Sequence, residues 1–511
     1  MKVTLISPYP DIHAFGIRTL SACLKREEDC DVRLVFLPRF MSDRYKDTTL
    51  NEIVKLSEES DLIGISLMTN FFDNAIQITK SLKENLSIPI VWGGIHPTIR
   101  PAECLDYADV VCIGESEETL VELARNIRDR KDFHNVQGIW FKDKEKIVKN
   151  ELRPLIQDLD SIPFPDYDYE THYTLSHGHI RKMDEDLFKK QMGVGVIYLT
   201  LPTRGCPFGC AYCCNNTLNK MYPKPLRRRS VDNVIEELMI VKSRLPFIEL
   251  VRFASDSFFT YSKEEIMDLA NKYKEKIGIP LQITGVAPSR LTRETLSLLV
   301  DAGLKFIRMG IQTGSERTKK LYKRHHSNQQ VEKAVKLIHE FKDIIRMPMY
   351  DIIIDNPWET EDDLIETLMF LSRLPTPYKL YIFSLTFFPG TDLHEKAKKD
   401  GILKDDLTDI YRKDYVYCEK TYLNKLFFLL AEAAQNGSRI SPKMMSLLTN
   451  RKLRKMKLSW LLYIILKIRN IPIGIQYLSH EGLKDIRRKN WSRINKYIKR
   501  LPKRIYRIRA T

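Results

Sequence analysis

Three closely spaced cysteines in the middle of the chain constrain its structure more than any other feature. Cys206, Cys210 and Cys213 follow the pattern Cys-x3-Cys-x2-Cys on a segment that also contains Gly and Pro. This spacing lets three thiolates converge on one metal centre, and thiolates are the ligands that iron–sulfur clusters require. Three ligands predict a 4Fe–4S cluster with one iron open to a small molecule. The alternatives are buried structural cysteines or a zinc site, whose fourth ligand would have to come from elsewhere because Cys214 is adjacent to Cys213.

Segments with strand-like and helix-like patterns alternate in the N-terminal third. Apolar runs predict strands at 2–7, 31–37, 61–68 and 88–92, with helical patterns at 17–26 and 72–86. This alternation is typical of a doubly wound parallel α/β sheet. Ligands bind such sheets at the carboxyl ends of the strands, so the loops after the strands are the candidate binding segments.

A second series of alternating segments begins after the middle of the chain. Strands are predicted at 196–199, 247–254, 281–286, 306–311, 350–354 and 380–386, with helical runs between them. Six strands in this order predict a partial (β/α)6 barrel, whose active site forms at the carboxyl ends of the strands. The cysteine motif directly follows the first of these strands, as that rule requires.

Composition shifts divide the chain into four expected parts. We expect a sheet domain over 1–145, a linker over 146–194, the barrel over 195–404 and a helical, basic region over 405–511. The linker contains Pro163 and Pro165 among aromatic residues, which predicts a stiff connector. Residues 170–192 of the linker are polar and lack clear periodicity, which predicts an excursion from the regular fold whose role the sequence does not indicate.

The charge is concentrated at one end. The 511 residues carry a net charge of +16, and Lys484 to Arg509 contain twelve Lys or Arg against one Asp. Helices are predicted at 421–436, 443–469 and 483–509, the last with a basic amphipathic pattern. This pattern is compatible with a solvated helical cap, an anionic membrane surface, or RNA or an acidic protein. Because one appended patch causes most of the charge, we do not expect nucleic acid as the partner.

Cysteine usage and apolar runs indicate the compartment. The nine cysteines form no evenly spaced disulfide framework, and the first residues are typical of a strand and not of a signal peptide. No run reaches the roughly 18 to 20 uncharged apolar residues that a membrane span needs. We expect a cytoplasmic protein, with peripheral membrane contact through the basic helix as a further option.

The cysteine segment resembles the signature loop of the radical S-adenosylmethionine (SAM) superfamily. The resembling residues are Arg-Gly-Cys-Pro-Phe-x-Cys-x-Tyr-Cys, from Arg204 to Cys213. The resemblance implies that the three cysteines hold a 4Fe–4S cluster whose open iron chelates SAM. Reductive cleavage of SAM would then give a 5′-deoxyadenosyl radical. Tyr212 matches the position that lies near the adenine in this family.

Later strand ends resemble the SAM-binding positions of the same superfamily. Asp256 follows the second barrel strand, where acidic residues are usual. Gln312 and Ser315 belong to a Gly-x-Glu-Ser-Gly-Ser-like segment in which Gln replaces the usual Glu. Arg290 and Lys323 stand where family members often have basic residues. Trp358 stands where glycine is common, which is expected to narrow the pocket.

The N-terminal loops resemble the cobalamin-binding domain of corrinoid enzymes. Asp11, His13 and Gly16 fit the Asp-x-His-x-x-Gly pattern, in which the His binds cobalt and the Asp orients the imidazole. The resemblance also implies that a Ser-containing loop and paired glycines surround the nucleotide tail. The matching residues here are Ser66, Gly93 and Gly94. Many radical SAM proteins with this domain lack such a His, so cobalt ligation by His13 stays an open alternative.

Together the resemblances imply a cobalamin-dependent radical SAM enzyme. Its expected cofactors are a 4Fe–4S cluster, SAM and cobalamin. Its expected activity is methylation of an unactivated carbon of a small-molecule or lipid-like substrate, with electrons from a flavodoxin- or ferredoxin-type donor. The alternatives are a radical SAM oxidoreductase or cyclase without methyl transfer, an RNA-modifying radical SAM enzyme, and a non-enzymatic cluster or corrinoid sensor.

Overall fold

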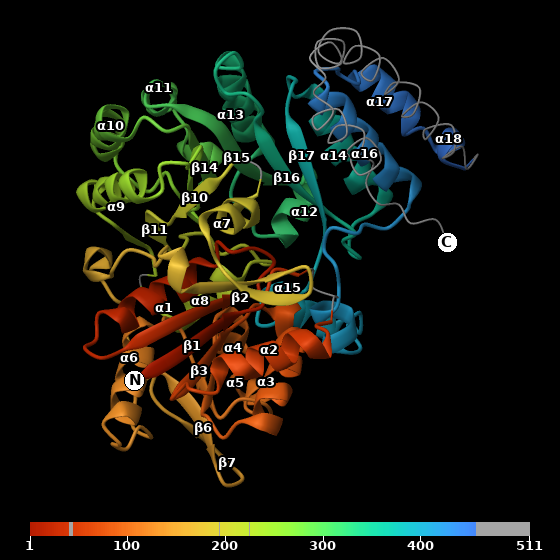
Figure 1. Ribbon diagram of the computed structural model, residues 1–511. Coiled ribbons are helices and arrows are strands. Elements are labelled where there is room, and N and C mark those ends of the chain that lie inside the picture. The colour runs from red at the N-terminus through yellow and green to blue at the C-terminus, as the bar shows by residue number, and fades with distance from the viewer. Residues whose placement is uncertain (40–43, 194, 224, 456–511) are drawn as a thin grey trace, which may run out of the picture.

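The computed structural model describes residues 1–455 except 40–43, 194 and 224. Figure 1 shows two α/β units, with the N-terminal unit in red and orange below the second unit in yellow to cyan. A group of C-terminal helices in blue packs beside the second unit. The predicted helix at 483–509 lies outside the described residues. Within them, none of the helices is long and apolar enough to cross a membrane.

The N-terminal unit is built on a sheet of nine strands in the order β7-β6-β5-β4-β3-β1-β2-β8-β9. The strands are β1 (Lys2–Ser7), β2 (Asp31–Phe36), β3 (Leu62–Ser66), β4 (Ile90–Gly93), β5 (Val110–Cys112), β6 (Ile139–Asp143), β7 (Lys146–Lys149), β8 (His172–Ser176) and β9 (His179–Lys182). Strands β5, β4, β3, β1, β2 and β8 are parallel, whereas β6, β7 and β9 add antiparallel edges. The strand order reverses between β1 and β3, which is where such sheets bind ligands.

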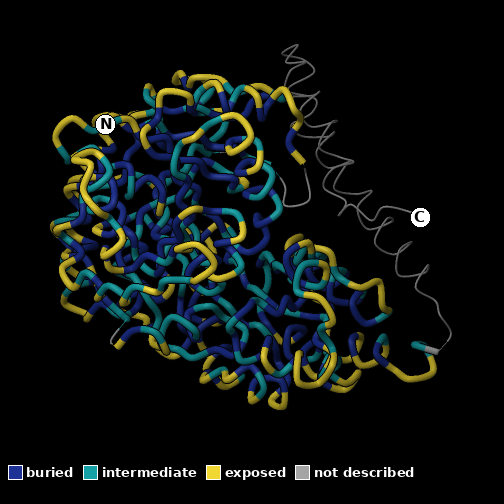
Figure 2. Tube along the Cα trace, turned by 90° about the horizontal axis from the view of Figure 1, so that it is seen from below, coloured by how far each residue is buried: buried dark blue, intermediate teal, exposed yellow. Residues whose placement is uncertain are grey.

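Helices cover this sheet on both faces, as the doubly wound pattern predicted. They are α1 (Phe15–Lys25), α2 (Asp47–Ser57), α3 (Phe72–Asn85), α4 (Ile95–Ile99), α5 (Pro101–Cys104) and α6 (Glu117–Arg128). Helix α6 starts with Glu117 and Glu118 and ends with Arg125 and Arg128, charges that match the helix dipole at both ends. Figure 2 shows that the buried backbone runs through the interior, with exposed stretches at the outer loops.

The segment 170–192, predicted as an irregular excursion, forms regular structure. Strand β8 pairs with β2 in parallel, β9 returns beside it, and helix α7 (Glu185–Met192) follows. The inward-facing residues of β8 are His172 and Thr174, both fully buried. Because these residues are polar, the strand lacks the apolar alternation by which strands are recognised. The chain thus returns to the first sheet before it enters the second.

The second unit has a six-stranded parallel sheet in chain order, as predicted for a partial barrel. Its strands are β10 (Ile197–Thr200), β13 (Leu250–Phe253), β14 (Leu281–Val286), β15 (Leu304–Gln312), β16 (Met349–Ile354) and β17 (Lys379–Ser384). Its helices are α8 (Cys214–Met221), α9 (Val231–Arg244), α10 (Lys263–Lys272), α11 (Arg293–Asp301), α12 (Glu316–Leu321), α13 (Asn328–Glu340), α14 (Glu361–Arg373) and α15 (Asp392–Lys399). A short pair, β11 (Thr203–Arg204) and β12 (Arg227–Arg228), flanks the cysteine segment.

The C-terminal helices pack on the outer strand of this sheet. They are α16 (Tyr422–Gln435), α17 (Pro442–Leu448) and α18 (Arg451–Lys455), with the break at Gly437 as predicted. Helix α16 lies against β17, and the amide of Tyr378 donates to the carbonyl of Ala434. The predicted helix at 443–469 is interrupted after Leu448, and its later part lies outside the described residues.

A buried arginine fastens the two units together. Arg18 of α1 is fully buried, and its guanidinium donates to the carbonyls of Ile12 at 2.7 and 2.9 Å and of Asp166 at 2.6 Å. It lies between the rings of Phe36 and Tyr167, at 4.5 and 4.0 Å from their centroids. Arg18 therefore links the loop after β1 to the proline-containing connector.

We expect Arg18→Leu to lower the free energy of unfolding by about 3 kcal/mol, because two buried carbonyls lose their only charged donor. Arg26→Leu is the matched control: this exposed arginine of the same chain segment donates to the carbonyl of Ser161 in the same connector. The control should change stability by no more than about 0.5 kcal/mol. Urea unfolding followed by circular dichroism measures both, and equal losses in the two variants would contradict this role.

Candidate functional site

The cysteine segment runs from β11 to the start of α8 at the carboxyl end of β10. Cys210 is buried, and Cys206 and Cys213 are half-buried. The amide of Cys213 donates to the carbonyl of Cys210 at 3.0 Å, and the side chain of Asn219 donates to the carbonyl of Cys206 at 3.0 Å. These bonds fix the loop's backbone so that all three thiols lie on one compact turn.

Neighbouring segments hold this turn in place. The amide of Ala211 donates to the carbonyl of Tyr322, and the amide of Leu393 donates to the carbonyl of Ala211, both at 3.0 Å. Gly205 has φ of +85°, and a Cβ there would overlap the carbonyl of Pro225. Glycine is therefore required at this position of the loop.

The three thiols of the motif are neighbours on this loop. Within the described ranges, no group of three or more His, Cys, Asp or Glu side chains lies close enough to hold one metal ion. Cys206, Cys210 and Cys213 nevertheless influence one another electrostatically, and burial raises the pKa of Cys206 to about 12. Three neighbouring thiols on one loop are compatible with the three-cysteine cluster that their spacing predicts, and binding to iron would remove the thiol protons.

Arg324 is a charged neighbour of this site that the sequence patterns did not indicate. Its Nη1 donates to the Sγ of Cys210 at 3.6 Å, and its Nη2 donates to the carbonyl of Gly310 at 2.7 Å. Although burial opposes it, the nearby Tyr212 and Cys210 raise the pKa of Arg324. Its neighbour Lys323, which was singled out from the sequence, instead pairs with Asp392 at 2.5 Å.

Tyr212 lies on the side of the loop that faces the barrel helices. Its ring meets the ring of Tyr322 edge-on, with 5.1 Å between centroids. Tyr322 is fully buried. This pair closes one side of the cysteine loop with aromatic surface, so that side is shielded from water. The predicted proximity of Tyr212 to adenine stays a prediction.

The rim of the barrel near this loop has unusual backbone geometry. Gln312, Lys323 and Asp355 are not glycines, yet their φ angles are +71°, +52° and +60°. Such conformations are uncommon for these residue types and gather at functional sites. Asp355 is fixed there by Asn424 of α16, whose Nδ2 donates to its carboxylate at 2.6 Å.

The other predicted SAM-binding residues have different surroundings. Asp256 is close enough to Cys206 and Cys213 to affect their ionisation. Ser315 is fully buried and caps α12, and its hydroxyl donates to Asp363 at 2.7 Å. The Ser315 hydroxyl also accepts from the amide of Thr318 at 3.3 Å, so this side chain is already engaged in the fold. Of the three residues, Asp256 and Gln312 are better placed than Ser315 to bind SAM.

His13 crosses from the N-terminal unit to the barrel. Its Nδ1 lies 3.2 Å from Oδ1 of Asp11, and its Nε2 donates to the carbonyl of Ile197 in β10 at 3.0 Å. Although burial opposes it, the hydrogen bond from His13 lowers the pKa of Asp11. Both ring nitrogens therefore have partners, and cobalt ligation would require His13 to leave Ile197.

The predicted tail-binding loops gather at the carboxyl ends of β3 and β4. Gly94 has φ of +104°, and a Cβ there would come within 2.6 Å of the carbonyl of Leu67 and 3.3 Å of Oγ of Ser66. Glycine is thus required at Gly94. A Cβ at Gly93 would meet only Cys112 at 3.8 Å, and one at Gly16 would meet nothing within 4 Å, so neither position requires glycine sterically. The protein's own backbone at the end of β3 accounts for the glycine at this position, and nucleotide-tail binding by this loop stays a prediction.

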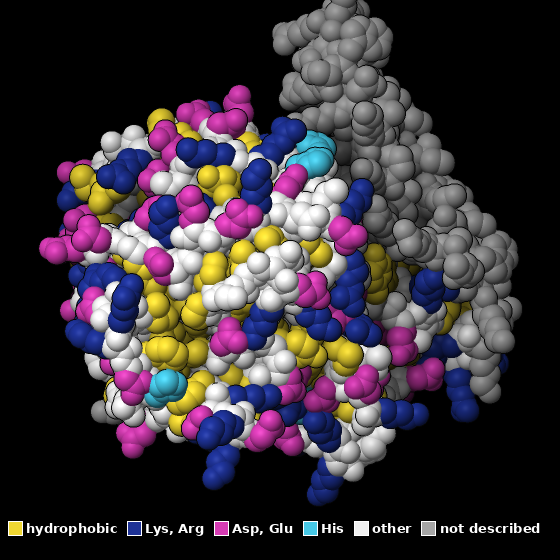
Figure 3. All heavy atoms as spheres, turned by 60° about the horizontal axis from the view of Figure 1, so that its bottom comes forward, with side chains coloured by type: hydrophobic (Ala, Val, Ile, Leu, Met, Phe, Trp, Pro, Cys, Tyr) yellow, Lys and Arg dark blue, Asp and Glu magenta, His cyan; other side chains and the backbone are white. Residues whose placement is uncertain are grey.

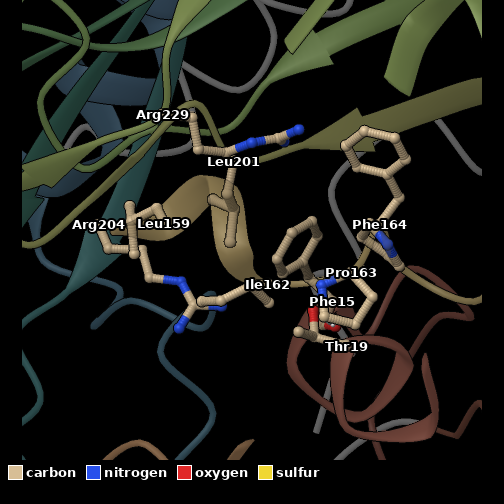
Figure 4. A pocket seen from close by; sticks show the side chains of 10 residues that line it. Phe15, Thr19, Leu159, Ile162, Pro163, Phe164, Leu201, Arg204 and Arg229 are labelled. Carbon is tan, nitrogen blue, oxygen red and sulfur yellow. Dashed lines mark hydrogen bonds between the residues drawn. The ribbon is translucent and has the colours of Figure 1, made fainter. Parts of the chain in front are cut away.

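A small recess lies where the connector meets β10 (Figure 4). Its volume is about 20 Å³, which is room for roughly one water. Its apolar walls include Phe15, Leu159, Ile162, Phe164 and Leu201. Arg204 and Arg229 also point into it, but Arg204 pairs with Glu117 at 2.7 Å and Arg229 pairs with Glu237. The recess is too small, and its charges too well matched, for a substrate site.

Comparison with known families matches both units. Residues 1–124 match the B12 binding domain, and residues 200–371 match the radical SAM superfamily. An uncharacterized methyltransferase of Pyrococcus horikoshii is 28% identical over 409 residues, which are 78% of this chain and 80% of that protein. Cytidylyl-2-hydroxyethylphosphonate methyltransferase of Streptomyces wedmorensis is 27% identical over 53% of this chain, and the match covers 54% of its own length.

Solved structures share the fold. The radical SAM methyltransferase TsrM from Kitasatospora setae, with tryptophan and a SAM analog, has a TM-score of 0.62 at 18% identity. That match covers 78% of this chain and 76% of TsrM. Another structure of TsrM holds cobalamin and a 4Fe–4S cluster.

The chain belongs to the radical SAM enzymes that carry an N-terminal B12-binding domain. Its cofactors are a 4Fe–4S cluster, SAM and cobalamin. The predicted fold class, a doubly wound sheet followed by a partial barrel, is confirmed. The assignment of single residues to these cofactors remains our proposal.

We expect Cys206→Ala, Cys210→Ala and Cys213→Ala each to abolish cluster assembly, because three thiolates are the minimum set for the predicted cluster. Cys214→Ala is the matched control, since Cys214 is adjacent to Cys213 and begins α8. Iron and sulfide bound per chain after anaerobic reconstitution measure the effect. The assignment is wrong if Cys214→Ala loses iron while one of the other three variants retains it.

The buried carboxyl group of Glu359, near this site, makes the free energy of unfolding depend on pH. Burial raises the pKa of Glu359 to about 7, and its Oε2 has no hydrogen-bond partner among the described residues. Because the folded protein holds this proton more tightly than the unfolded chain, stability falls as pH rises from about 4.5 through about 7. Glu359→Gln mimics the protonated form. Its gain in unfolding free energy over the wild type should therefore be small at about pH 5 and reach roughly 2 kcal/mol at about pH 8.

The control for this prediction is Glu361→Gln in the same segment, whose side chain is 70% exposed. Denaturant unfolding of the three proteins across this pH range measures the difference. A Glu359→Gln gain that does not change with pH would show that the carboxyl group is not the titrating group.

Proposed function

We propose that this enzyme methylates an unactivated carbon of a small-molecule or lipid-like substrate. One observation carries the proposal: the loop after β1 reaches the barrel strand that leads into the cysteine segment. His13 of that loop donates to Ile197, and β10 continues from Ile197 into the cysteine loop. The segments proposed for the two cofactors are therefore neighbours, as a transfer between them requires. The methyltransferases among the relatives support the same activity.

The chain's own residues have distinct parts in this proposal. When bound, the cluster supplies the electron that cleaves SAM, and cobalamin supplies the methyl group. Cys206, Cys210 and Cys213 would hold the cluster. Arg324 keeps a positive charge beside Cys210, and hydrogen bonds to such sulfurs raise a cluster's reduction potential.

The rim residues would orient SAM. Gln312 can donate to or accept from a ribose hydroxyl or the amino acid group of SAM without adding a charge. Asp256 would accept from the ammonium group. The Tyr212–Tyr322 pair would exclude water on the helix side. Excluding water protects a radical from quenching and strengthens these polar contacts.

The domain organisation and partners complete the proposal. We retain a cobalamin domain over 1–145 and a barrel over 195–404, and we add β8 and β9 of the predicted linker to the first sheet. The proposed electron donor is a flavodoxin- or ferredoxin-type protein, and the proposed location is cytoplasmic. Figure 3 shows Lys, Arg, Asp and Glu interspersed over the described face, without a field of one sign that would favour nucleic acid.

The products of SAM test the proposal. A reconstituted chain with cluster, cobalamin and a reductant should give both S-adenosylhomocysteine and 5′-deoxyadenosine, because methyl transfer by this route uses one SAM as donor and another as radical source. Cys210→Ala should give neither 5′-deoxyadenosine nor radical product, yet bind cobalamin as the wild type does. Deoxyadenosine alone would favour a radical cyclisation or rearrangement, and cleavage that survives in Cys210→Ala would overturn the site.

A further inference from the structure

The inward face of the barrel sheet carries a polar layer that none of the proposed cofactor contacts uses. Residues along the strands alternate between buried side chains facing the helices and partly exposed side chains on the opposite face. Arg252, Gln282, Arg308, Asp351 and Tyr381 belong to this layer, one from each of the strands β13 to β17. The pairing places Arg252 beside Leu199 of β10 and beside Gln282, so the layer reaches the strand that leads to the cysteine loop.

Arg308 is paired with a carboxylate of the adjacent strand. Its Nε donates to both carboxylate oxygens of Asp351 at 3.0 Å, and its Nη2 lies 2.9 Å from Oδ1. Its guanidinium also lies 4.7 Å from the ring of Tyr381 and 5.9 Å from that of Phe383. These two rings are stacked at an interplanar angle of 9°. Arg308 is thus a fixed, neutralised cation against an aromatic wall.

Arg252 differs from Arg308 in having no carboxylate partner. Its Nε donates to Oε1 of Gln282 at 2.8 Å, and in the described part of the chain no Asp or Glu oxygen lies within ion-pairing distance of it. Burial and the nearby charge of Arg308 lower the pKa of Arg252. Asp11 also acts on it from a distance, but that carboxylate is engaged by His13.

Gln282 lies between the two arginines in the strand order, and Asp351 lies on the far side of Arg308. One carboxylate therefore balances two neighbouring arginines, and a positive charge remains on this face. A half-buried cation without a counter-ion is costly, and an anion that enters beside it recovers that cost. The two terminal nitrogens of Arg252 form a planar fork that matches the two oxygens of a carboxylate or a phosphate. Tyr381 already packs against Arg308 and Lys379, so Phe383 is the ring of this pair that offers apolar surface to the body of the same molecule.

We propose that Arg252, with Arg308 two strands away on the same face, binds an oxyanion of the substrate. This oxyanion is a carboxylate or a phosphate on a molecule with an apolar or aromatic body. The inference rests on the proposed function, because it takes the inward face of the barrel as the place where the substrate meets the radical. It adds the chemical class of that substrate. The anion would anchor the molecule in the middle of the strands, and its reacting carbon would extend toward the cysteine loop.

Calorimetric titration of the reconstituted full chain, with SAM at saturation, tests this proposal. The probes share one ring: phenylacetate, phenyl phosphate and benzyl alcohol. At least one anion should bind, and benzyl alcohol should bind at least about tenfold more weakly. The tighter of the two anions distinguishes a carboxylate from a phosphate. Equal binding of the alcohol, no binding of either anion, or binding that occurs only without SAM would each overturn the proposal.

Three variants sharpen the test. Arg252→Gln should weaken the bound anion by about tenfold or more, whereas Arg252→Lys should keep part of the affinity because the charge remains without the fork. Arg244→Gln is the matched control, an exposed arginine at the end of α9 in the same barrel. Unchanged binding in Arg252→Gln overturns the site. Cobalamin content and circular dichroism confirm that each variant is folded.

A separate measurement distinguishes failure of the proposed function from failure of the anion site. SAM cleavage by the wild type without probes reports the radical activity, and anion binding requires no turnover. A chain that binds anions through Arg252 but does not transfer methyl groups would retain the site and lose the methyltransferase assignment. A chain that cleaves SAM but binds no anion would retain the enzyme and lose the site.

Discussion

The buried guanidinium of Arg18 is the interaction on which the relative position of the two units depends. It joins the carbonyl of Ile12, in the loop proposed to face cobalamin, to the carbonyl of Asp166 in the connector. Tyr167 of the same connector packs on Tyr198 of β10, with 4.7 Å between the rings. The loop, the connector and the first barrel strand are thereby one rigid assembly. A flexible tether would let the two units separate, whereas these contacts hold the segments proposed for the two cofactors beside each other.

Three arginines near the open end of the barrel have different partners. Arg324 lies against Cys210, Arg308 lies against Asp351, and Arg252 has no acid beside it. Each arginine thus meets a different environment although all three belong to the same barrel. The first contacts a proposed cluster ligand, the second pairs with a carboxylate of the adjacent strand, and the third is the one we propose to bind a ligand. The strained backbone at Gln312 and Asp355 marks the same rim independently of charge.

The sequence predicted the two parallel sheets from apolar runs and the cluster from tight cysteine spacing, which are local signals, whereas SAM and cobalamin were expected from the resemblance to known families. It missed β8 because the buried residues His172 and Thr174 are polar. It pointed to Lys323, one residue from Arg324, because only the fold decides which of two neighbouring cations turns toward Cys210. The contact of His13 with Ile197 joins residues 184 positions apart, and no local pattern encodes such a pair.

An open barrel has two outer strands, each with one edge unpaired within the sheet. Neighbouring segments form hydrogen bonds to both of these strands. His13 occupies a carbonyl on β10, while the amide of Ser384 in β17 donates to the carbonyl of Tyr415 in the segment after the barrel. Exposed strand edges are templates for pairing with other chains. The N-terminal loop and the segment around Tyr415 therefore serve as edge protection, and a barrel cut free of them would be prone to self-association. The contact of His13 with Ile197 thus both joins the N-terminal unit to the barrel and covers one of the barrel's outer strands.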